Sequence, residues 1–146
     1  MVYQYKTGYR HVVPVEVAVA ELEKLPEVTA HNVVEAARAE DAPLHREFEW
    51  DDSIAGEHWR EKQARDLIQH IVVVHEDTPT LEPVRAYHHL TIESPAYTPI
   101  QVIMKSHDMT EQLLACAKKE LTAFKRKYAG LEALTKVFVA IDELTA

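Results

Sequence analysis

Apolar residues recur at helical spacing in two short runs near the amino terminus. The first run predicts a helix from Pro14 to about Leu25, closed by Pro26. The second predicts a helix through Ala39 that begins at Thr29, because a hydroxyl oxygen can accept a bond from a free amide of the first turn. The apolar positions are Val15, Val19 and Leu22 in the first helix and Val33, Val34 and Ala37 in the second.

Two other parts of the chain have the composition of strands, with β-branched and aromatic residues between turn residues. Residues 2–13 predict an extended segment or a hairpin with a turn at Thr7–Gly8. The middle of the chain contains three strand-like runs, separated by Pro79, Pro83 and Pro95. Short connections favour an antiparallel meander. The three predicted strands are His70–His75, Val84–Glu93 and Thr98–Lys105.

A third helix is predicted between the loop at residues 40–51 and the first of these strands. Asp51, Asp52 and Ser53 predict its start, since short oxygen-bearing side chains cap free amides and negative charge suits the helix dipole. It is expected to reach Gln69. Its apolar face would contain Ala55, Trp59, Leu67 and Ile71, with Trp50 and Trp59 largely buried.

The carboxyl-terminal part of the chain returns to helical spacing. Asp108 and Glu111 have capping-box spacing at the start of a long helix, which Gly130 ends. A last helix follows, so the two are expected to pack as a helical hairpin. The apolar positions are Met109, Leu113, Ala117, Leu121, Phe124 and Tyr128, then Leu131, Leu134, Phe138 and Ile141.

These elements predict one α+β domain over residues 1–146, with a small antiparallel sheet of about three strands and about five helices. The sequence leaves open whether the amino-terminal segment extends the sheet. Cys116 is the single cysteine, which excludes an internal disulfide. The amino terminus lacks a secretory apolar region and no apolar run could cross a bilayer. A cytoplasmic protein without a membrane partner is expected.

Charge is unevenly distributed within the net charge of −8. The segment from Glu16 to Glu57 has 12 acidic and 3 basic residues, a net of −9. The segment from Lys105 to Lys136 has 7 basic and 4 acidic residues, a net of +3. Two solvated helical faces would explain this polarity, and so would two surfaces for different partners.

The segment from Glu40 to Asp52 resembles small phage and prophage proteins. The shared pattern is an acidic residue, then Asp-Ala/Ser-Pro-Leu-His, then Phe-Glu-Trp-Asp/Asn-Asp. The likeness extends to Trp59-Arg60, Gln63-Ala64-Arg65, Leu67-Ile68, Phe124–Tyr128 and Ala140-Ile141-Asp142, and so covers most of the chain. It implies an accessory protein of a virus or mobile element in the cytoplasm of a bacterial host. It implies no activity, because the family has none assigned.

Catalytic and metal motifs are missing from the sequence. Ser106, His107 and Asp108 are consecutive, so their side chains cannot form a nucleophile relay. The nine histidines do not have metalloprotease spacing, and His70 and His75 would point to opposite faces of a strand. With three glycines there is no phosphate-binding loop. The sequence therefore predicts no cofactor, metal ion or catalytic residue, and a small hydrolase assembled from distant residues is the third alternative.

Binding is the favoured function, and two surfaces compete. The first is the acidic loop, which would contact a protein partner with a basic surface; its alternative is a structural loop anchored by Phe48 and Trp50. The second is the basic end of the carboxyl-terminal hairpin, which would contact nucleic acid; its alternative is a solvated helical face. A homo-oligomer is left open. The candidate residues are Glu40, Asp41, His45, Glu47, Glu49 and Asp51 for the protein partner, and Lys118, Lys119, Lys125, Arg126 and Lys127 for nucleic acid.

Overall fold

The structure is a computed structural model that describes residues 1–54, 56–78 and 80–146. The fold is α+β, as predicted, with six α-helices and two small antiparallel sheets in the described residues. The chain divides into two compact units, residues 1–100 and residues 101–146. A single domain over the whole chain stays a prediction.

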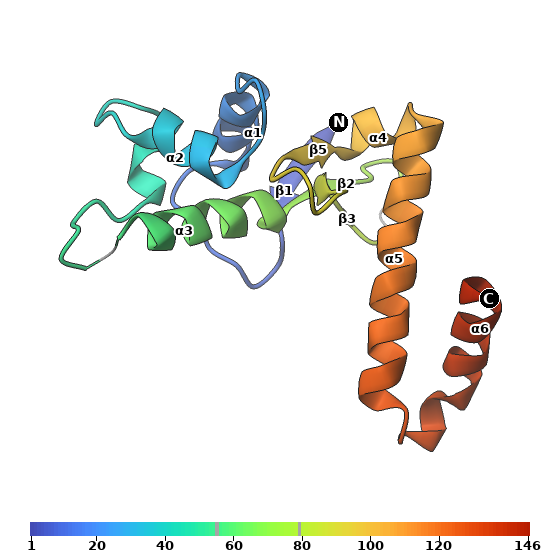
Figure 1. Cartoon of the computed structure of the whole chain (residues 1–146). Coiled ribbons are helices and arrows are strands. Elements are labelled where there is room, and N and C mark those ends of the chain that lie inside the picture. Colours follow the sequence, from blue (N-terminus) through green and yellow to red (C-terminus); the bar gives the residue numbers. More distant parts are fainter. Residues whose placement is uncertain (55, 79) are drawn as a thin grey trace. The chain divides into compact units, whose positions relative to one another are not determined.

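The first unit begins its helical part as the sequence predicts (Figure 1). Helix α1 spans Val15–Glu23 and α2 spans Ala30–Ala37. The Thr29 hydroxyl oxygen accepts a hydrogen bond from the Asn32 amide at 3.0 Å, which confirms the predicted N-cap. The six predicted apolar positions of the two helices are all buried in one core.

The amino-terminal segment is an edge strand. Strand β1 (Val2–Tyr5) pairs antiparallel with β2 (Ile71–Val74), and β2 pairs with β3 (Val84–Arg85). The predicted turn at Thr7–Gly8 is present, with Gly8 at φ 92°, a conformation that favours glycine. The extension of the sheet by this segment is confirmed. The hairpin alternative is wrong, because the partner of β1 is supplied by the middle of the chain.

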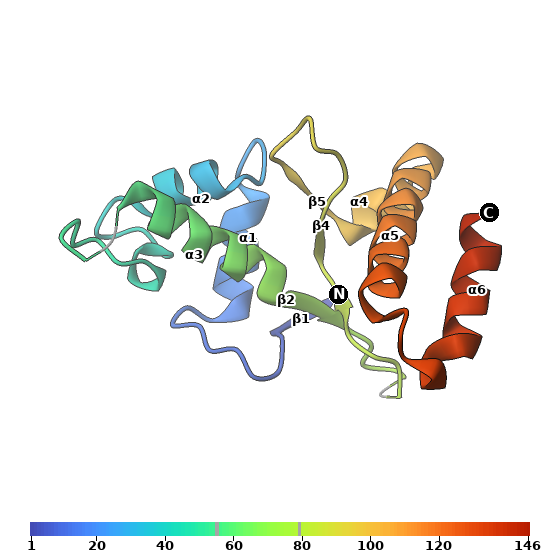
Figure 2. The same cartoon turned by 60° about the horizontal axis from the view of Figure 1, so that its bottom comes forward.

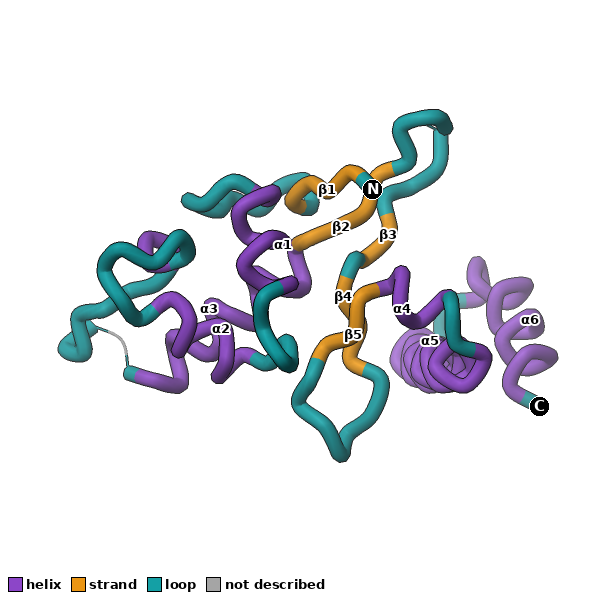
Figure 3. Tube along the Cα trace, turned by 90° about the horizontal axis from the view of Figure 1, so that it is seen from above, coloured by secondary structure: helices purple, strands orange, loops and turns teal. Residues whose placement is uncertain are grey.

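The predicted three-stranded meander is wrong in its second half (Figure 3). Strand β4 (Tyr87–His89) pairs with β5 (Tyr97–Pro99) in a second sheet, and after Pro99 the chain forms the short helix α4 (Ile100–Met104). The backbone hydrogen bonds of Ala86 account for the break between β3 and β4. Its amide donates to the Ile71 carbonyl at 3.0 Å and its carbonyl accepts from the Ile100 amide at 2.8 Å. The backbone thus changes partners there and passes from one sheet to the other.

The third helix begins later than predicted. Helix α3 spans Glu57–His70 and packs beside α2 (Figure 2), with Gly56 at its N-cap and no side-chain cap. Asp51 instead forms a turn of its own, in which its Oδ1 accepts from the Ser53 amide at 2.9 Å. Capping by Asp51 or Asp52 is therefore wrong. The buried face is Arg60, Ala64, Leu67 and Ile68; the predicted position Ala55 lies outside the described residues.

The second unit contains the predicted helical hairpin. Helices α5 (His107–Tyr128) and α6 (Thr135–Thr145) run antiparallel (Figure 1), and the Phe124 and Phe138 rings lie 6.5 Å apart between centroids. Gly130 lies in the turn between them. The predicted cap is wrong, because the Ser106 hydroxyl oxygen accepts from the Met109 amide at 3.3 Å and Asp108 is already in the first turn.

Candidate functional site

The acidic loop, residues Glu40–Asp52, has an apolar inner side. Leu44 and Phe48 are buried at 1% and 7% exposure, and a single 3-10 turn over His45–Glu47 lies between them. Burial of side chains of this size contributes roughly 1.5–3 kcal/mol each. The loop is therefore packed on the core of the first unit and has one defined conformation.

Trp50 is the second anchor of the loop. Its indole N–H donates to the His45 carbonyl at 2.8 Å, and its ring stacks on the His45 imidazole with centroids 4.8 Å apart. The Arg38 and Arg60 guanidinium groups lie 5.6 Å and 5.3 Å from the ring centroid. The burial prediction holds in part for Trp50, which is half-buried, and is wrong for Trp59, which is 49% exposed.

Arg60 connects the loop to α3. Although it stands on the buried face of the helix, its guanidinium pairs with the carboxylates of Asp52 at 2.7 Å and Glu57 at 3.0 Å. It also donates to the Glu49 carbonyl at 3.3 Å. A buried cation needs partners of this kind. Asp52 thus pairs with a buried arginine instead of capping a helix.

Glu47 faces inward and begins a chain of hydrogen bonds that the sequence did not reveal. One carboxylate oxygen lies 2.6 Å from His11 Nδ1, and the other accepts the amides of Val12 and Val13, both at 3.0 Å. The far nitrogen of His11, Nε2, lies 2.9 Å from His70 Nδ1. The Glu47 side chain is 8% exposed, so this residue connects the loop to the amino-terminal segment and is not available to a partner.

Aromatic rings cover both histidines. Tyr5 lies against His11, with ring centroids 4.3 Å apart, and Tyr9 lies against His70 at 3.8 Å. Burial, and then the nearby His11, lowers the pKa of His70, so its neutral form is favoured. Burial raises the pKa of Tyr5, and the Glu47 carboxylate adds to this effect.

This Glu47–His11–His70 chain resembles part of a catalytic relay, in which an acid orients a base. A relay also needs a nucleophile within hydrogen-bond distance of the base. Among the described residues, neither imidazole bonds to a serine, threonine or cysteine side chain. The hydrogen bonds among Glu47, His11 and His70 therefore fix the amino-terminal segment against the loop.

The remaining predicted partner-binding residues differ in how exposed their side chains are. Glu40, Asp41 and Asp51 are exposed. The Ser53 hydroxyl, and then its amide, lowers the pKa of Asp51, which therefore stays ionised at neutral pH. Glu49 is half-buried and accepts the Asp51 amide at 3.0 Å. Three of the six predicted partner-binding residues, Glu40, Asp41 and Asp51, are thus exposed carboxylates, while His45, Glu47 and Glu49 hold the loop in place.

A polar pocket of about 610 Å³ in the first unit bears on the hydrolase alternative. Its lining includes His31, His89, Glu27, Glu61 and Arg65. The closest acid and base there, Glu61 Oε1 and His31 Nδ1, are 3.8 Å apart, which is too long for a hydrogen bond. This geometry does not provide an oriented base.

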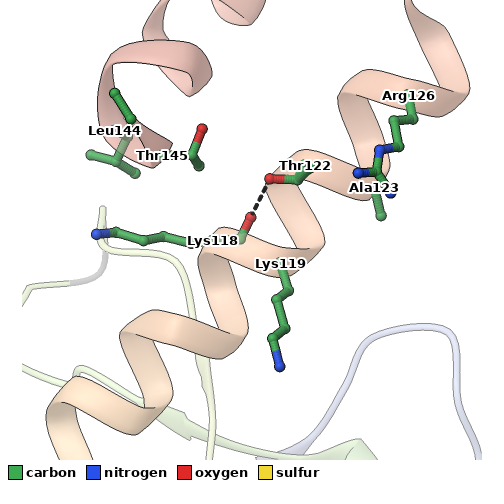
Figure 4. A pocket seen from close by; sticks show the side chains of 8 residues that line it. Lys118, Lys119, Thr122, Ala123, Arg126, Leu144 and Thr145 are labelled. Atoms are coloured by element: carbon green, nitrogen blue, oxygen red, sulfur yellow. Dashed lines mark hydrogen bonds between the residues drawn. The ribbon is translucent and has the colours of Figure 1, made fainter.

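The five predicted nucleic-acid residues of the hairpin separate into two groups. Lys125 pairs with Asp142 of α6, and the Lys127 ammonium lies 5.2 Å from the Tyr128 ring centroid. The other three, Lys118, Lys119 and Arg126, line one pocket of about 440 Å³ between α5 and α6 (Figure 4). No carboxylate side chain is among the described residues that line it.

Comparison of the chain with models of protein families, with curated proteins and with solved structures gives no match. Across residues 1–54, 56–78 and 80–146, no three His, Cys, Asp or Glu side chains are grouped to hold a metal ion. No helix in these ranges is both long and apolar enough to span a membrane. The acidic loop and the basic pocket of the hairpin are therefore the two candidate binding surfaces.

Proposed function

We propose that this chain is a phage or prophage accessory protein that acts by stoichiometric binding to a protein partner with a basic surface. The contact surface is the outward side of the acidic loop together with the adjacent ends of α2 and α3. One observation carries the proposal: the loop is held by Leu44, Phe48 and Trp50 on its inner side, while Glu40, Asp41 and Asp51 remain exposed.

A rigid acidic surface suits binding for two physical reasons. Anchoring by buried side chains removes most of the conformational freedom that the loop would otherwise lose in a complex, so less of the contact energy is spent on ordering. Its charge also steers the approach of a basic partner. The segment from Glu35 to Glu61 contains 9 acidic and 3 basic residues, a net of −6.

The positions of the basic residues support the same reading. Of the three basic residues, Arg60 is buried and paired, and Arg38 is bonded to Glu35 at 2.7 Å and to Glu57 at 2.9 Å. Arg46 is the one exposed cation of the described loop outside these pairs. Glu40 and Asp41 have no cation partner among the described residues. A surface with no interaction role usually intersperses both signs of charge. The unpaired carboxylates at residues 40 and 41 are therefore the centre of the proposed contact.

The test is charge reversal at that centre with a matched control. The variant E40K/D41K reverses two exposed loop carboxylates, and the control E76K/D77K makes the same change at two exposed residues that follow β2. Each is used as bait in a bacterial lysate, and the association rate with an immobilised lysine-rich peptide is measured over a salt series. The loop variant should lose the captured protein and associate more slowly; the control should keep both properties.

Two results would contradict the proposal. If both variants lose binding equally, only the net charge matters and the loop is not a specific surface. If neither changes any association and circular dichroism shows that both are folded, the acidic loop is structural only. The earlier candidates Glu47 and Glu49 are unsuitable for this test, because their replacement would disturb the loop itself.

A further inference from the structure

We propose that the pocket between α5 and α6 binds the phosphate backbone of nucleic acid, through Lys118, Lys119 and Arg126. This site belongs to the second unit and is independent of the proposed function of the acidic loop. It differs from the sequence-based surface in its residues, since Lys125 is neutralised by Asp142 and Lys127 does not line the pocket.

The three cations of the pocket have no hydrogen-bond or ion-pair partner in the part of the chain that the structure describes. Among the described residues, no carboxylate or carbonyl accepts a bond from Lys118 Nζ, Lys119 Nζ or the Arg126 guanidinium. Like charges that share one pocket repel one another, and a bound anion would remove that repulsion. An anion bound from outside would therefore complete this set of donors.

The hydroxyl groups in the pocket are already committed. Thr122 Oγ1 donates to the Lys118 carbonyl at 3.0 Å, and Thr145 Oγ1 donates to the Ile141 carbonyl at 2.8 Å. Neither can also donate its proton to a ligand. Recognition would therefore depend on the three charged groups, which is typical of phosphate contacts that carry no sequence information.

The cations are spread out, which favours a chain of phosphates over a single ion. Figure 4 shows Lys118 and Lys119 extending in different directions from neighbouring positions of α5, with Arg126 further along the helix. The eight helical steps from Lys118 to Arg126 correspond to about 12 Å of helix axis. About three consecutive phosphates of one DNA strand cover that length.

The aromatic residues of the hairpin are placed for packing and not for base recognition. Phe124 lies 5.0 Å from Tyr128 and 6.5 Å from Phe138 between ring centroids, and none of the three lines the pocket. Stacking on aromatic rings is what gives single-strand-binding proteins much of their affinity. Without it, the contact should be electrostatic and independent of base identity.

The test measures fluorescence anisotropy of labelled DNA with the full chain. The probes are a single strand of about ten nucleotides, with thymine or adenine bases, and the duplex of the same length. The pocket variant is K118Q/K119Q/R126Q. The control K105Q/K127Q/K136Q removes the same charge from three cations of the same unit that do not line the pocket.

The wild type should bind with an affinity that falls with salt between about 50 and about 200 mM, with a log–log slope of about −2 for the single strand and about −3 for the duplex. The pocket variant should lose most of that slope and bind at least about tenfold more weakly at the lowest salt. The control should keep most of the slope of the wild type, because its three cations do not line the pocket.

Three results would overturn this inference. The first is no binding by the wild type at the lowest salt. The second is an equal loss in the pocket variant and the control, which would mean that only total charge matters. The third is a strong difference between thymine and adenine strands. The variant E40K/D41K separates the two proposals, because it should bind DNA at least as well as the wild type even if it no longer captures a protein.

Discussion

The acidic loop and the basic end of the hairpin carry opposite charge, and they differ in how that charge is held. In the loop, Glu47 and Glu49 accept backbone amides and Asp52 pairs with the buried Arg60. In the hairpin, Lys118, Lys119 and Arg126 have no such bonds among the described residues, and none of the 22 residues of α5 is buried. The charges of the loop therefore help to hold its backbone, whereas these three cations of the hairpin lie on a helix surface outside the internal pairs of the described residues.

This difference shows why a count of charges does not identify a working surface. Half of the candidate carboxyl and imidazole groups in the loop serve the fold and cannot meet a partner without breaking it. In the hairpin, the pairing of Lys125 with Asp142 removes one candidate, and the rest stay available. The charges that remain free after internal pairing are the ones to test.

The largest expected effect is on Glu47. Its replacement in E47A leaves His11 and the Val13 amide without their acceptor in a half-buried site, and it also removes the acceptor of the exposed Val12 amide. Loss of hydrogen bonds to a buried charged group should lower the free energy of unfolding by about 3 kcal/mol. Urea denaturation followed by circular dichroism measures it.

Glu40 supplies the control within the same loop. E40A removes an exposed carboxylate, and its effect should stay within about 0.5 kcal/mol. Equal stability of E47A and E40A would mean that the inward carboxylate does not hold the loop. The loop charges would then not differ from the hairpin cations in their contribution to the fold.

The two tryptophans give the next largest contrast. W50F removes an indole N–H donor and weakens the contact with two guanidinium groups, so it should cost about 1–2 kcal/mol. W59F changes an exposed ring and should cost less than about 0.5 kcal/mol. Acrylamide should quench the remaining Trp59 in W50F more strongly than the remaining Trp50 in W59F. The reverse order of quenching would show that the loop is not packed.

Local features of this chain were predictable because their causes are local. A cap such as Thr29 and the apolar faces of α1 and α2 depend on residues within one or two turns, so spacing alone identifies them. The helical hairpin follows from the same kind of pattern. The error at Asp51 is also instructive, since the same side chain suits a helix cap and a tight turn, and here it forms the turn.

The rest depends on contacts between distant residues, which one sequence does not reveal. The bond between Glu47 and His11 spans 36 residues, and His11 meets His70 across 59 residues. The sequence does not place Arg60 in the core, because arginine is rarely buried, and its burial becomes possible only once Asp52 and Glu57 are beside it. The exposed carboxylates of the loop could therefore not be separated from the inward ones beforehand.

A smaller effect is expected at the start of the hairpin. S106A removes the acceptor of the Met109 amide and should cost about 1 kcal/mol, whereas D108A should cost about 0.5 kcal/mol through the helix dipole alone. Thermal unfolding of both variants measures the difference. A larger loss in D108A would restore the capping role that the sequence predicted for it.

The smallest expected effect is on the pH dependence of stability, and it tests whether His70 belongs to the fixed network. Its folded pKa lies below the ordinary value, so the unfolded chain binds a proton that the folded chain resists. Stability from this group is therefore complete above the ordinary histidine pKa of about 6.5 and falls as the pH decreases below it. One such proton gives a slope of at most about 1.4 kcal/mol per pH unit.

H70N removes the titration, so its free energy of unfolding should change less between about pH 8 and about pH 5 than that of the wild type. Carboxylates and the other histidines contribute to both curves, and the difference between the curves isolates His70. H75N, which replaces an exposed histidine, is the matched control. Parallel profiles for H70N and H75N would mean that His70 is not buried beside His11 in solution, and His70 would then not belong to the network that fixes the amino-terminal segment against the loop.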